Sequence, residues 1–146
     1  MGWGGGGDGK VEVLRFAAPD SDVTAFRSTL GFQLHEDHGR PPQRIVEAGP
    51  WAIDAYVEDP LETRFIQSFK TFAARPALTG TVIDNRRYGF EDLLSTFLLR
   101  LRHHGGAAME TLPARVIVGR PVTFAGGSDE RLALERYETA FSRLGF

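Results

Sequence analysis

The chain has 146 residues, 42% of them hydrophobic and 25% charged, which supplies enough apolar mass for one domain with its own core. A formal net charge of −2 gives no reason to expect a nucleic acid or an anionic membrane as partner, and no apolar run approaches the ~20 residues of a membrane span. The absence of cysteine excludes disulfides, thiolate nucleophiles and cysteine-based zinc sites, and it fits a reducing compartment, so we expect a cytoplasmic protein.

The front of the chain predicts three strands. Residues 10–16 alternate in polarity behind an Asp8-Gly9 turn, which predicts a strand with a partner strand upstream. Only Met1-Gly2-Trp3 is there to supply that partner and it is too short, so we expect a chain that is cut at its front. The second and third strands are expected over residues 25–34 and 43–47, joined by a polar hairpin loop.

Two helices are expected next. Gly49-Pro50 opens a short helix, since proline is well tolerated in a first turn. Its apolar face is expected to hold Trp51, Ala55 and Tyr56. Pro60 starts a second helix, with Lys70 beside a stripe at helical spacing made of Phe65, Ile66, Phe69 and Phe72. A loop and a short strand at residues 81–83 follow.

The rear of the chain predicts a helix, a strand and a helix. Residues 90–103 have apolar positions spaced by three and four, with Glu91 and Asp92 in the first turn and basic residues in the last, as the helix dipole prefers. Residues 115–124 are a β-branched run that ends in Gly-Arg-Pro, which predicts a strand buried on both faces of a layered α/β sheet. The last helix is expected over residues 128–144, with a buried face of Ala133, Tyr137, Ala140, Phe141 and Leu144.

Three patterns that resemble functional motifs are better explained as structure. The glycine run at residues 4–7 precedes a strand rather than a helix, which favours a hairpin turn over a phosphate loop. The His35-Glu36-Asp37-His38 segment and the His103-His104 pair could supply metal ligands, but a solvated loop and a helix C-terminus are the favoured interpretations. A catalytic triad is disfavoured, because no serine lies in a Gly-x-Ser-x-Gly turn.

Lys70, Arg120 and Pro121 each permit two interpretations. A lysine next to an aromatic stripe usually lays its stem on the apolar surface and keeps its ammonium in water. The alternative is an ammonium that faces phosphate and stabilises the charge developing on a transferring phosphoryl group. Arg120 and Pro121 form either a rigid strand exit or the lining of a cleft, because α/β proteins tend to place ligands at strand ends.

Four segments, taken in order, resemble the nucleotide-binding domain of the DnaK-like (seventy-kilodalton heat-shock protein) family. They are residues 65–72 (Phe-Ile-Gln-Ser-Phe-Lys-Thr-Phe), 88–93 (Tyr-Gly-Phe-Glu-Asp-Leu), 116–124, and the helix that ends at residues 144–146 (Leu-Gly-Phe). The closer similarity is to a bacterial subgroup that matches only the ATPase half of the family. It covers most of the chain from about Asp8, although residues 17–56 match loosely.

The resemblance implies an actin-like ATPase (ribonuclease H-like) fold, in which two lobes close on Mg-ATP and drive the cycle of a stress-response chaperone acting on unfolded client proteins. It places Lys70 at the family's catalytic lysine near the γ-phosphate. It places Pro121 at the proline that couples nucleotide state to domain movement, with Arg120 beside it at the nucleotide. Residues 17–85 would form a peripheral subdomain, and residues 1–16 and 86–146 the core subdomain, with a mixed sheet flanked by helices.

The departures from the family pattern define the expected function. Nothing before Lys10 matches the family's Asp-x-Gly-Thr phosphate turn, and neither the second phosphate loop nor the adenine-binding lobe is present. We therefore expect an incomplete first lobe, a fragment that does not hydrolyse ATP alone and that has an unpaired apolar edge at residues 116–118. Two alternatives remain, a non-catalytic interaction module that uses an exposed sheet edge, and an enzyme of another class built around His35, Asp37 and Lys70.

Overall fold

The protein is represented by a computed structural model that describes residues 2–4, 11–36, 41–77, 79–111, 116–119 and 129–145. These residues form a mixed α/β fold of three α-helices and four small sheets, which confirms the fold class at this level. Every strand pair among them is antiparallel, which differs from the mixed sheet expected from the sequence. Most of these strands follow one another through short connections, which permit only antiparallel pairing.

Two short ribbons lie at the front of the chain. β1 (Gly2–Gly4) pairs with β2 (Val11–Val13), and β3 (Phe16–Ala17) pairs with β4 (Asp22–Val23). The single strand expected here is therefore divided between two ribbons, and the upstream partner that we judged too short does pair. The second ribbon reaches the core through the buried ring of Phe16, whereas β2 of the first ribbon is exposed.

The central sheet has three antiparallel strands in the order β6-β5-β7: β5 (Thr29–His35), β6 (Gln43–Ala48) and β7 (Thr63–Gln67). β5 and β6 correspond to the predicted second and third strands, although β5 begins later than expected. Helix α1 (Pro50–Glu58) packs on one face of this sheet, as predicted from its proline start. The carbonyl oxygen of Ala52 in α1 lies 3.3 Å from where a Cβ of Gly31 would be, so glycine permits this close approach.

The apolar face predicted for α1 is only partly correct. Ala52 is the fully buried residue of the helix, whereas Tyr56 is 41% exposed. The ring of Tyr56 stacks on Phe65 of β7, with centroids 4.8 Å apart. The tyrosine therefore covers the outer part of the sheet instead of entering the core.

A small hairpin lies on the opposite face of the sheet. It is formed by β8 (Thr81–Ile83), which the sequence predicts, and β9 (Arg86–Tyr88). The ring of Tyr88 contacts Phe32 of β5 at a centroid distance of 5.2 Å. Nε of Arg44 lies 3.2 Å from the carboxylate of Asp84 in the turn, which ties the hairpin to β6.

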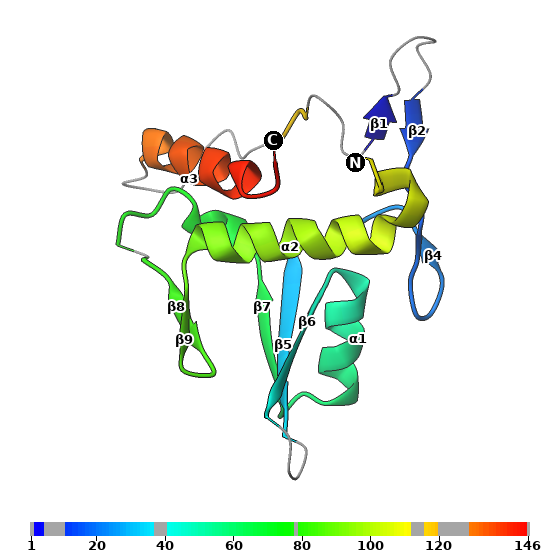
Figure 1. The fold of residues 1–146 in the computed structure, drawn as a ribbon, viewed down its shortest axis with the longest axis vertical. Coiled ribbons are helices and arrows are strands. Elements are labelled where there is room, and N and C mark those ends of the chain that lie inside the picture. The colour runs from blue at the N-terminus through cyan, green and yellow to red at the C-terminus, as the bar shows by residue number, and fades with distance from the viewer. Residues whose placement is uncertain are drawn as a thin grey trace.

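Two longer helices close the fold at one end of the sheet (Figure 1). α2 (Phe90–Gly105) crosses the ends of the strands, and α3 (Glu130–Ser142) packs on the other side of α2. Both confirm the predicted helices, and the turn η2 (Gly106–Met109) follows α2. The largest fully buried side chains join these layers and are those of Phe16, Leu30, Phe32, Phe69 and Leu101.

The second predicted helix is wrong. The segment that begins at Pro60 forms β7 and then a 3₁₀ turn, η1 (Phe69–Phe72). Thr63 and Ile66 are both buried although they lie on opposite faces of β7, one toward α1 and one toward the β8–β9 side. A strand covered on both faces loses its alternation, so its apolar positions can imitate helical spacing.

The strand predicted at residues 115–124 is not present where the structure describes that segment. Val116 and Val118 are each 42% exposed, Ile117 is fully exposed, and residues 116–119 form no strand. The prediction of burial on both faces is therefore wrong for them, because β-branched composition gives a strand preference but not a partner. Arg120, Pro121 and the rest of that run lie outside the described residues.

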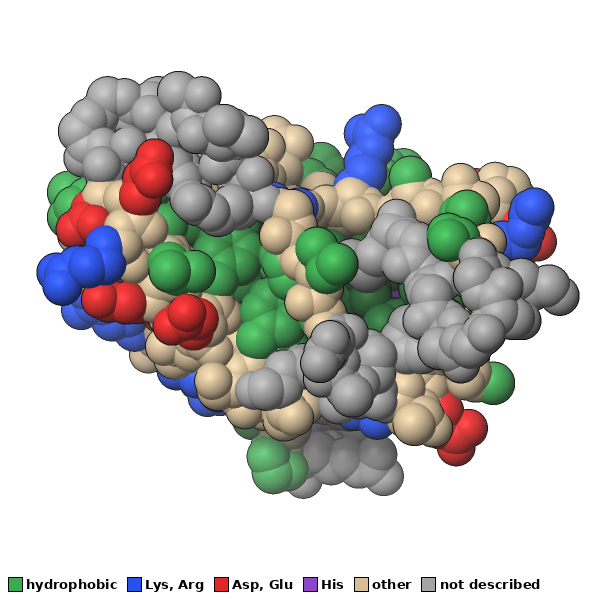
Figure 2. Space-filling view, turned by 90° about the horizontal axis from the view of Figure 1, so that it is seen from above, with side chains coloured by type: hydrophobic (Ala, Val, Ile, Leu, Met, Phe, Trp, Pro, Cys, Tyr) green, Lys and Arg blue, Asp and Glu red, His purple; other side chains and the backbone are tan. Residues whose placement is uncertain are grey.

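The face seen from above separates charge from apolar surface (Figure 2). Charged side chains gather toward one end, over α3, and hydrophobic side chains are exposed in the middle of the face. Among the described helices, none has the length and apolarity needed to cross a bilayer.

Candidate functional site

Lys70 lies on the 3₁₀ turn that follows β7. The strand ends at Gln67, and Ser68 then adopts a left-handed conformation with φ of 55°, which turns the chain sharply into η1. A positive φ at a non-glycine residue costs free energy and persists only where the surrounding structure imposes it. Lys70 is half-buried at this turn.

Phe69 fixes the turn to the core. Its side chain is completely buried, and its ring meets Phe97 of α2 edge-on at a centroid distance of 5.6 Å. A second contact, to Phe90 at 6.4 Å, reaches the start of the same helix. The backbone of Lys70 is therefore held against α2 by the preceding residue.

Arg136 of α3 fixes the other end of the turn. Its Nη1 donates to the carbonyl oxygens of Phe72 at 2.9 Å, Ala73 at 3.0 Å and Arg75 at 3.3 Å. A guanidinium offers several donors in a rigid fork, which suits carbonyl oxygens that can accept a further hydrogen bond where a turn ends. Arg136 was not predicted from the sequence, because nothing in its spacing connects it with a turn more than sixty residues earlier.

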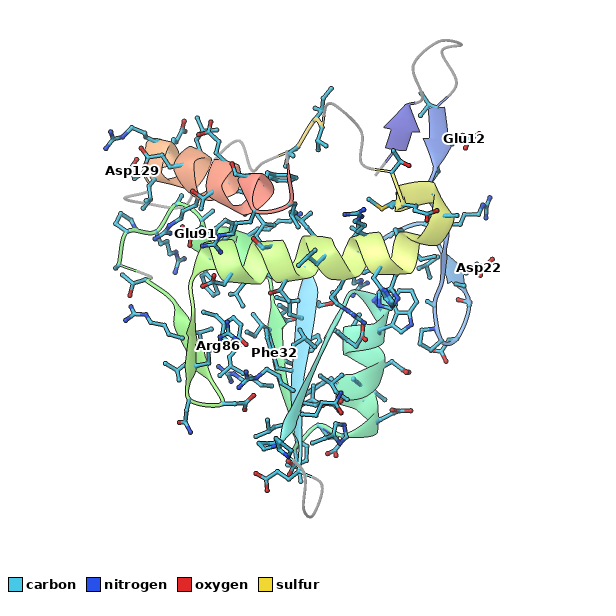
Figure 3. All side chains as sticks on the ribbon, in the orientation of Figure 1. Glu12, Asp22, Phe32, Arg86, Glu91 and Asp129 are labelled. Atoms are coloured by element: carbon cyan, nitrogen blue, oxygen red, sulfur yellow. The ribbon has the colours of Figure 1, made fainter. Side chains whose placement is uncertain are left out.

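The starts of α2 and α3 complete this support. Arg136 places its Nε 3.5 Å from the carboxylate of Glu91, in the first turn of α2. The backbone N–H of Asp129, the N-cap of α3, donates to the carbonyl of Ala74 at 3.0 Å. Figure 3 shows Glu91 and Asp129 on the same side of the molecule, where the two helices begin. The segment after Lys70 is thus held by both helices.

The ammonium group of Lys70 has no acidic partner in the part of the chain that the structure describes. A half-buried cation on a rigid backbone can accept an anion without first breaking an ion pair. Arg120 and Pro121, the other two residues that the resemblance assigns to nucleotide, lie outside the described residues. The structure therefore describes Lys70 alone of the three.

A cavity of about 390 Å³ opens beside β7, immediately before the Lys70 turn. Its walls are mainly apolar, with Arg64 and Gln67 as the longest polar side chains. It is lined by Arg64, Phe65, Ile66, Gln67, Phe72, Gly80, Thr81, Phe90 and Leu93. Lys70 does not line this cavity, so the cavity and the ammonium are separate features of the same region.

A second polar cluster, which the sequence did not indicate, joins β6 to the end of α2. The carboxylate of Glu47 accepts hydrogen bonds from Nε of Arg100 at 3.2 Å and from its Nη2, and it lies 2.8 Å from Nε2 of His104. The indole of Trp51, at the start of α1, stacks on His104. This cluster joins three elements, and no sequence motif indicates it, because its residues are divided among β6, α1 and α2.

Burial lowers the pKa of His104 below its ordinary value, because the ring is taken out of water. The hydrogen bond and the charge of Glu47 act in the opposite direction but do not reverse the shift. His103 and His104 lie in the last turn of α2, which confirms their interpretation as a helix C-terminus.

Among the described residues, His35 and His104 lie too far apart to share a metal ion. His35 pairs with Gln43 at one end of the central sheet, whereas Trp51 and His104 lie beyond its other end, where Leu30 pairs with Ala48. Five residues of strand separate the two ends, which is roughly 17 Å. Asp37 and His38 lie outside the described residues. Of the alternative enzyme site expected from His35, Asp37 and Lys70, the structure therefore describes only His35 and Lys70.

No family model matches this chain. No solved structure matches it either.

Proposed function

We propose that this chain forms part of the nucleotide-binding unit of an ATP-dependent chaperone similar to the DnaK-like family, with an actin-like arrangement of lobes. In this proposal Lys70 faces the γ-phosphate of Mg-ATP. The support comes first from the sequence, in which four segments follow the family's order. It comes next from the rigid turn that holds Lys70.

The observation that carries the proposal is the placement of a cation on a supported turn. Phe69 is buried on one side of Lys70 and Arg136 binds the carbonyl groups on the other, yet no described carboxylate neutralises the ammonium. An ammonium is a compact charge suited to phosphate oxygens, and its rigid placement lowers the reorganisation needed when a phosphate binds.

The role proposed for Lys70 is electrostatic. The ammonium would stabilise the negative charge that develops on the transferring phosphoryl group, and the bound Mg²⁺ would supply the remaining neutralisation. Phosphoryl transfer also needs phosphate-binding loops and metal-binding carboxylates, and the sequence contains no Asp-x-Gly-Thr turn. We therefore expect weak nucleotide binding and no hydrolysis by these residues alone.

Lysine-directed labelling tests this proposal on the chain as it is. An acyl-phosphate derivative of ATP transfers its acyl group to a lysine that lies beside the terminal phosphate. Lys10 is the chain's other lysine and provides an internal control. We expect Lys70 to be labelled faster than Lys10, and excess Mg-ATP to suppress labelling at Lys70 alone, as measured by mass spectrometry of the digested protein.

Equal labelling of both lysines, with no competition by Mg-ATP, would overturn the assignment of Lys70. A matched control uses Lys10→Arg, which should leave labelling at Lys70 unchanged. Thermal stability measured with and without Mg-ATP gives a second readout. A gain of several degrees would show tight binding by this chain alone and would contradict the expectation of an incomplete site.

One alternative function has a specific observation in its favour. β7 is an edge strand of the central sheet among the described residues, and a mainly apolar cavity lies beside it. Such an edge can receive an added strand, so a non-catalytic interaction module is the second candidate. Labelling of Lys70 that excess Mg-ATP does not suppress would favour this alternative.

A further inference from the structure

Residues 116–119 form an exposed apolar segment. The side chain of Ile117 is fully exposed, and Val116 and Val118 are each 42% exposed. A Cβ added at Gly119 would meet no atom within 4 Å, so there is open space at that end of the segment. Figure 1 shows the segment near the C-terminal end of the chain. A fully exposed isoleucine between two partly exposed valines is unfavourable in water. Such β-branched residues prefer an extended backbone, which suits them for strand pairing.

The cavity beside β7 offers an edge of matching length. Four consecutive residues of β7, from Arg64 to Gln67, line it, and so does Thr81 at the start of β8. β7 pairs only with β5 among the described strands, so its other edge has backbone groups without ladder partners. The floor is apolar, with Phe72, Phe90 and Leu93. An added strand could therefore pair along the edge and bury side chains on this floor.

The segment and the cavity match in length and in chemistry. In the sequence, the uncharged run between Arg115 and Arg120 is Val116 to Gly119, as long as the four residues of β7 at the cavity, and its two valines would point to the same side of a strand. Arg64 and Gln67 lie at the cavity wall, where their polar ends can remain in water while an uncharged strand enters. A peptide with acidic or basic side chains would bind this apolar floor less favourably, because burying charge there costs free energy.

The two features lie on opposite sides of α2 in one molecule. In Figure 1, residues 116–119 are on the side of α2 that faces α3, whereas β7 extends from its other side. We infer that residues 116–119 of one copy of this chain add as a strand to the edge of β7 in a second copy. The net charge of −2 produces little repulsion between two copies, and a reciprocal exchange would make two identical contacts.

Cysteine pairing tests this contact directly, because the chain has no cysteine of its own. A copy with Ile117→Cys is mixed with a copy that carries Gln67→Cys, an exposed residue at the cavity. The control partner carries Val57→Cys, which is 72% exposed on α1 and away from the cavity. We expect the Ile117–Gln67 disulfide to form at least tenfold faster than the Ile117–Val57 disulfide.

The oligomeric state of the unmodified chain gives an independent readout. We expect its mass in light scattering or sedimentation to rise from monomer toward dimer with concentration. Ile117→Lys should weaken this association at least tenfold while leaving the circular dichroism spectrum unchanged. A chain that stays monomeric at all concentrations, or equal disulfide rates for Gln67→Cys and Val57→Cys, would overturn the inference.

Discussion

The indole of Trp51 lies flat against the imidazole of His104, with ring centroids 3.5 Å apart and planes within 9° of parallel. This contact joins the first turn of α1 to the last turn of α2. The carboxylate of Glu47 in β6 binds Nε2 of the same imidazole. The stack and the Glu47 contact therefore bring α1, α2 and β6 together at one ring. The strength of the stack depends on the charge of His104.

We expect stability to fall as the pH drops through the titration range of His104. Burial holds the pKa of His104 below 6.5, so between these two values the unfolded chain binds a proton that the folded chain does not. The free energy of unfolding therefore decreases as the pH falls from 6.5 toward the folded pKa. Urea unfolding at a series of pH values measures this slope.

The variant His104→Gln isolates this effect, since glutamine keeps a hydrogen-bond donor for Glu47 but does not titrate near neutral pH. Its slope over the same range should be smaller than that of the unmodified chain. Trp3→Phe in both proteins leaves Trp51 as the only indole, so that fluorescence reports the stack itself. Identical slopes with and without His104 would show that other groups cause the pH dependence.

Arg136→Met should destabilise the fold by about 2 to 3 kcal/mol, because three carbonyl groups lose a charged donor. Methionine keeps most of the aliphatic stem, so the loss reports the hydrogen bonds rather than packing. Arg131→Met on the same helix is the matched control. Arg131 is 83% exposed and has only a 3.8 Å contact with Glu135, so its removal should change stability by less than about 0.5 kcal/mol. Equal losses would exclude the proposed support of the Lys70 turn.

The helices were predicted correctly from the sequence where all of their local signals favour the same secondary structure. α2 has apolar residues on one face, acidic residues in its first turn and glycine at its end, and each signal points to the same helix. α1 was equally clear from Gly49-Pro50. The face predicted for α3 follows the same logic, with Ala133, Tyr137 and Ala140 buried and Phe141 and Leu144 only partly buried.

The errors occurred where tertiary contacts decide the backbone. β7 is covered on both faces, by α1 and by the β8–β9 side, and nothing local distinguishes such a strand from an amphipathic helix. Residues 116–118 have high β-propensity but no described neighbour strand, so propensity alone did not produce burial. The supports of Lys70 come from residues distant in sequence, Phe97 and Arg136, which a linear pattern cannot join.

Asn85→Gly should stabilise the β8–β9 hairpin. Asp84 and Asn85 both have positive φ, at 46° and 60°, as in the two-residue turn that prefers Asn-Gly. Glycine at the second position removes the steric cost of the left-handed conformation, and we expect a gain of about 0.5 kcal/mol. Asn85→Val should instead cost about 1 to 2 kcal/mol, since a β-branched residue tolerates this φ poorly. Thermal unfolding of both variants gives the order, and a more stable valine variant would contradict the turn geometry.

Gly49→Ala should be among the most damaging single-methyl additions in the described chain. Gly49 has φ of 60°, and a Cβ at this position would lie 2.6 Å from the ring of Phe26. The left-handed conformation costs about 1 to 2 kcal/mol, and displacing a packed ring adds about 1 to 3 kcal/mol. Gly106→Ala separates the two costs, because Gly106 has φ of 54° and open space around it, so only the first applies. Chemical denaturation should therefore give Gly49→Ala a clearly lower free energy of unfolding than Gly106→Ala. An equal decrease for both variants would mean that the Phe26 ring moves aside without cost.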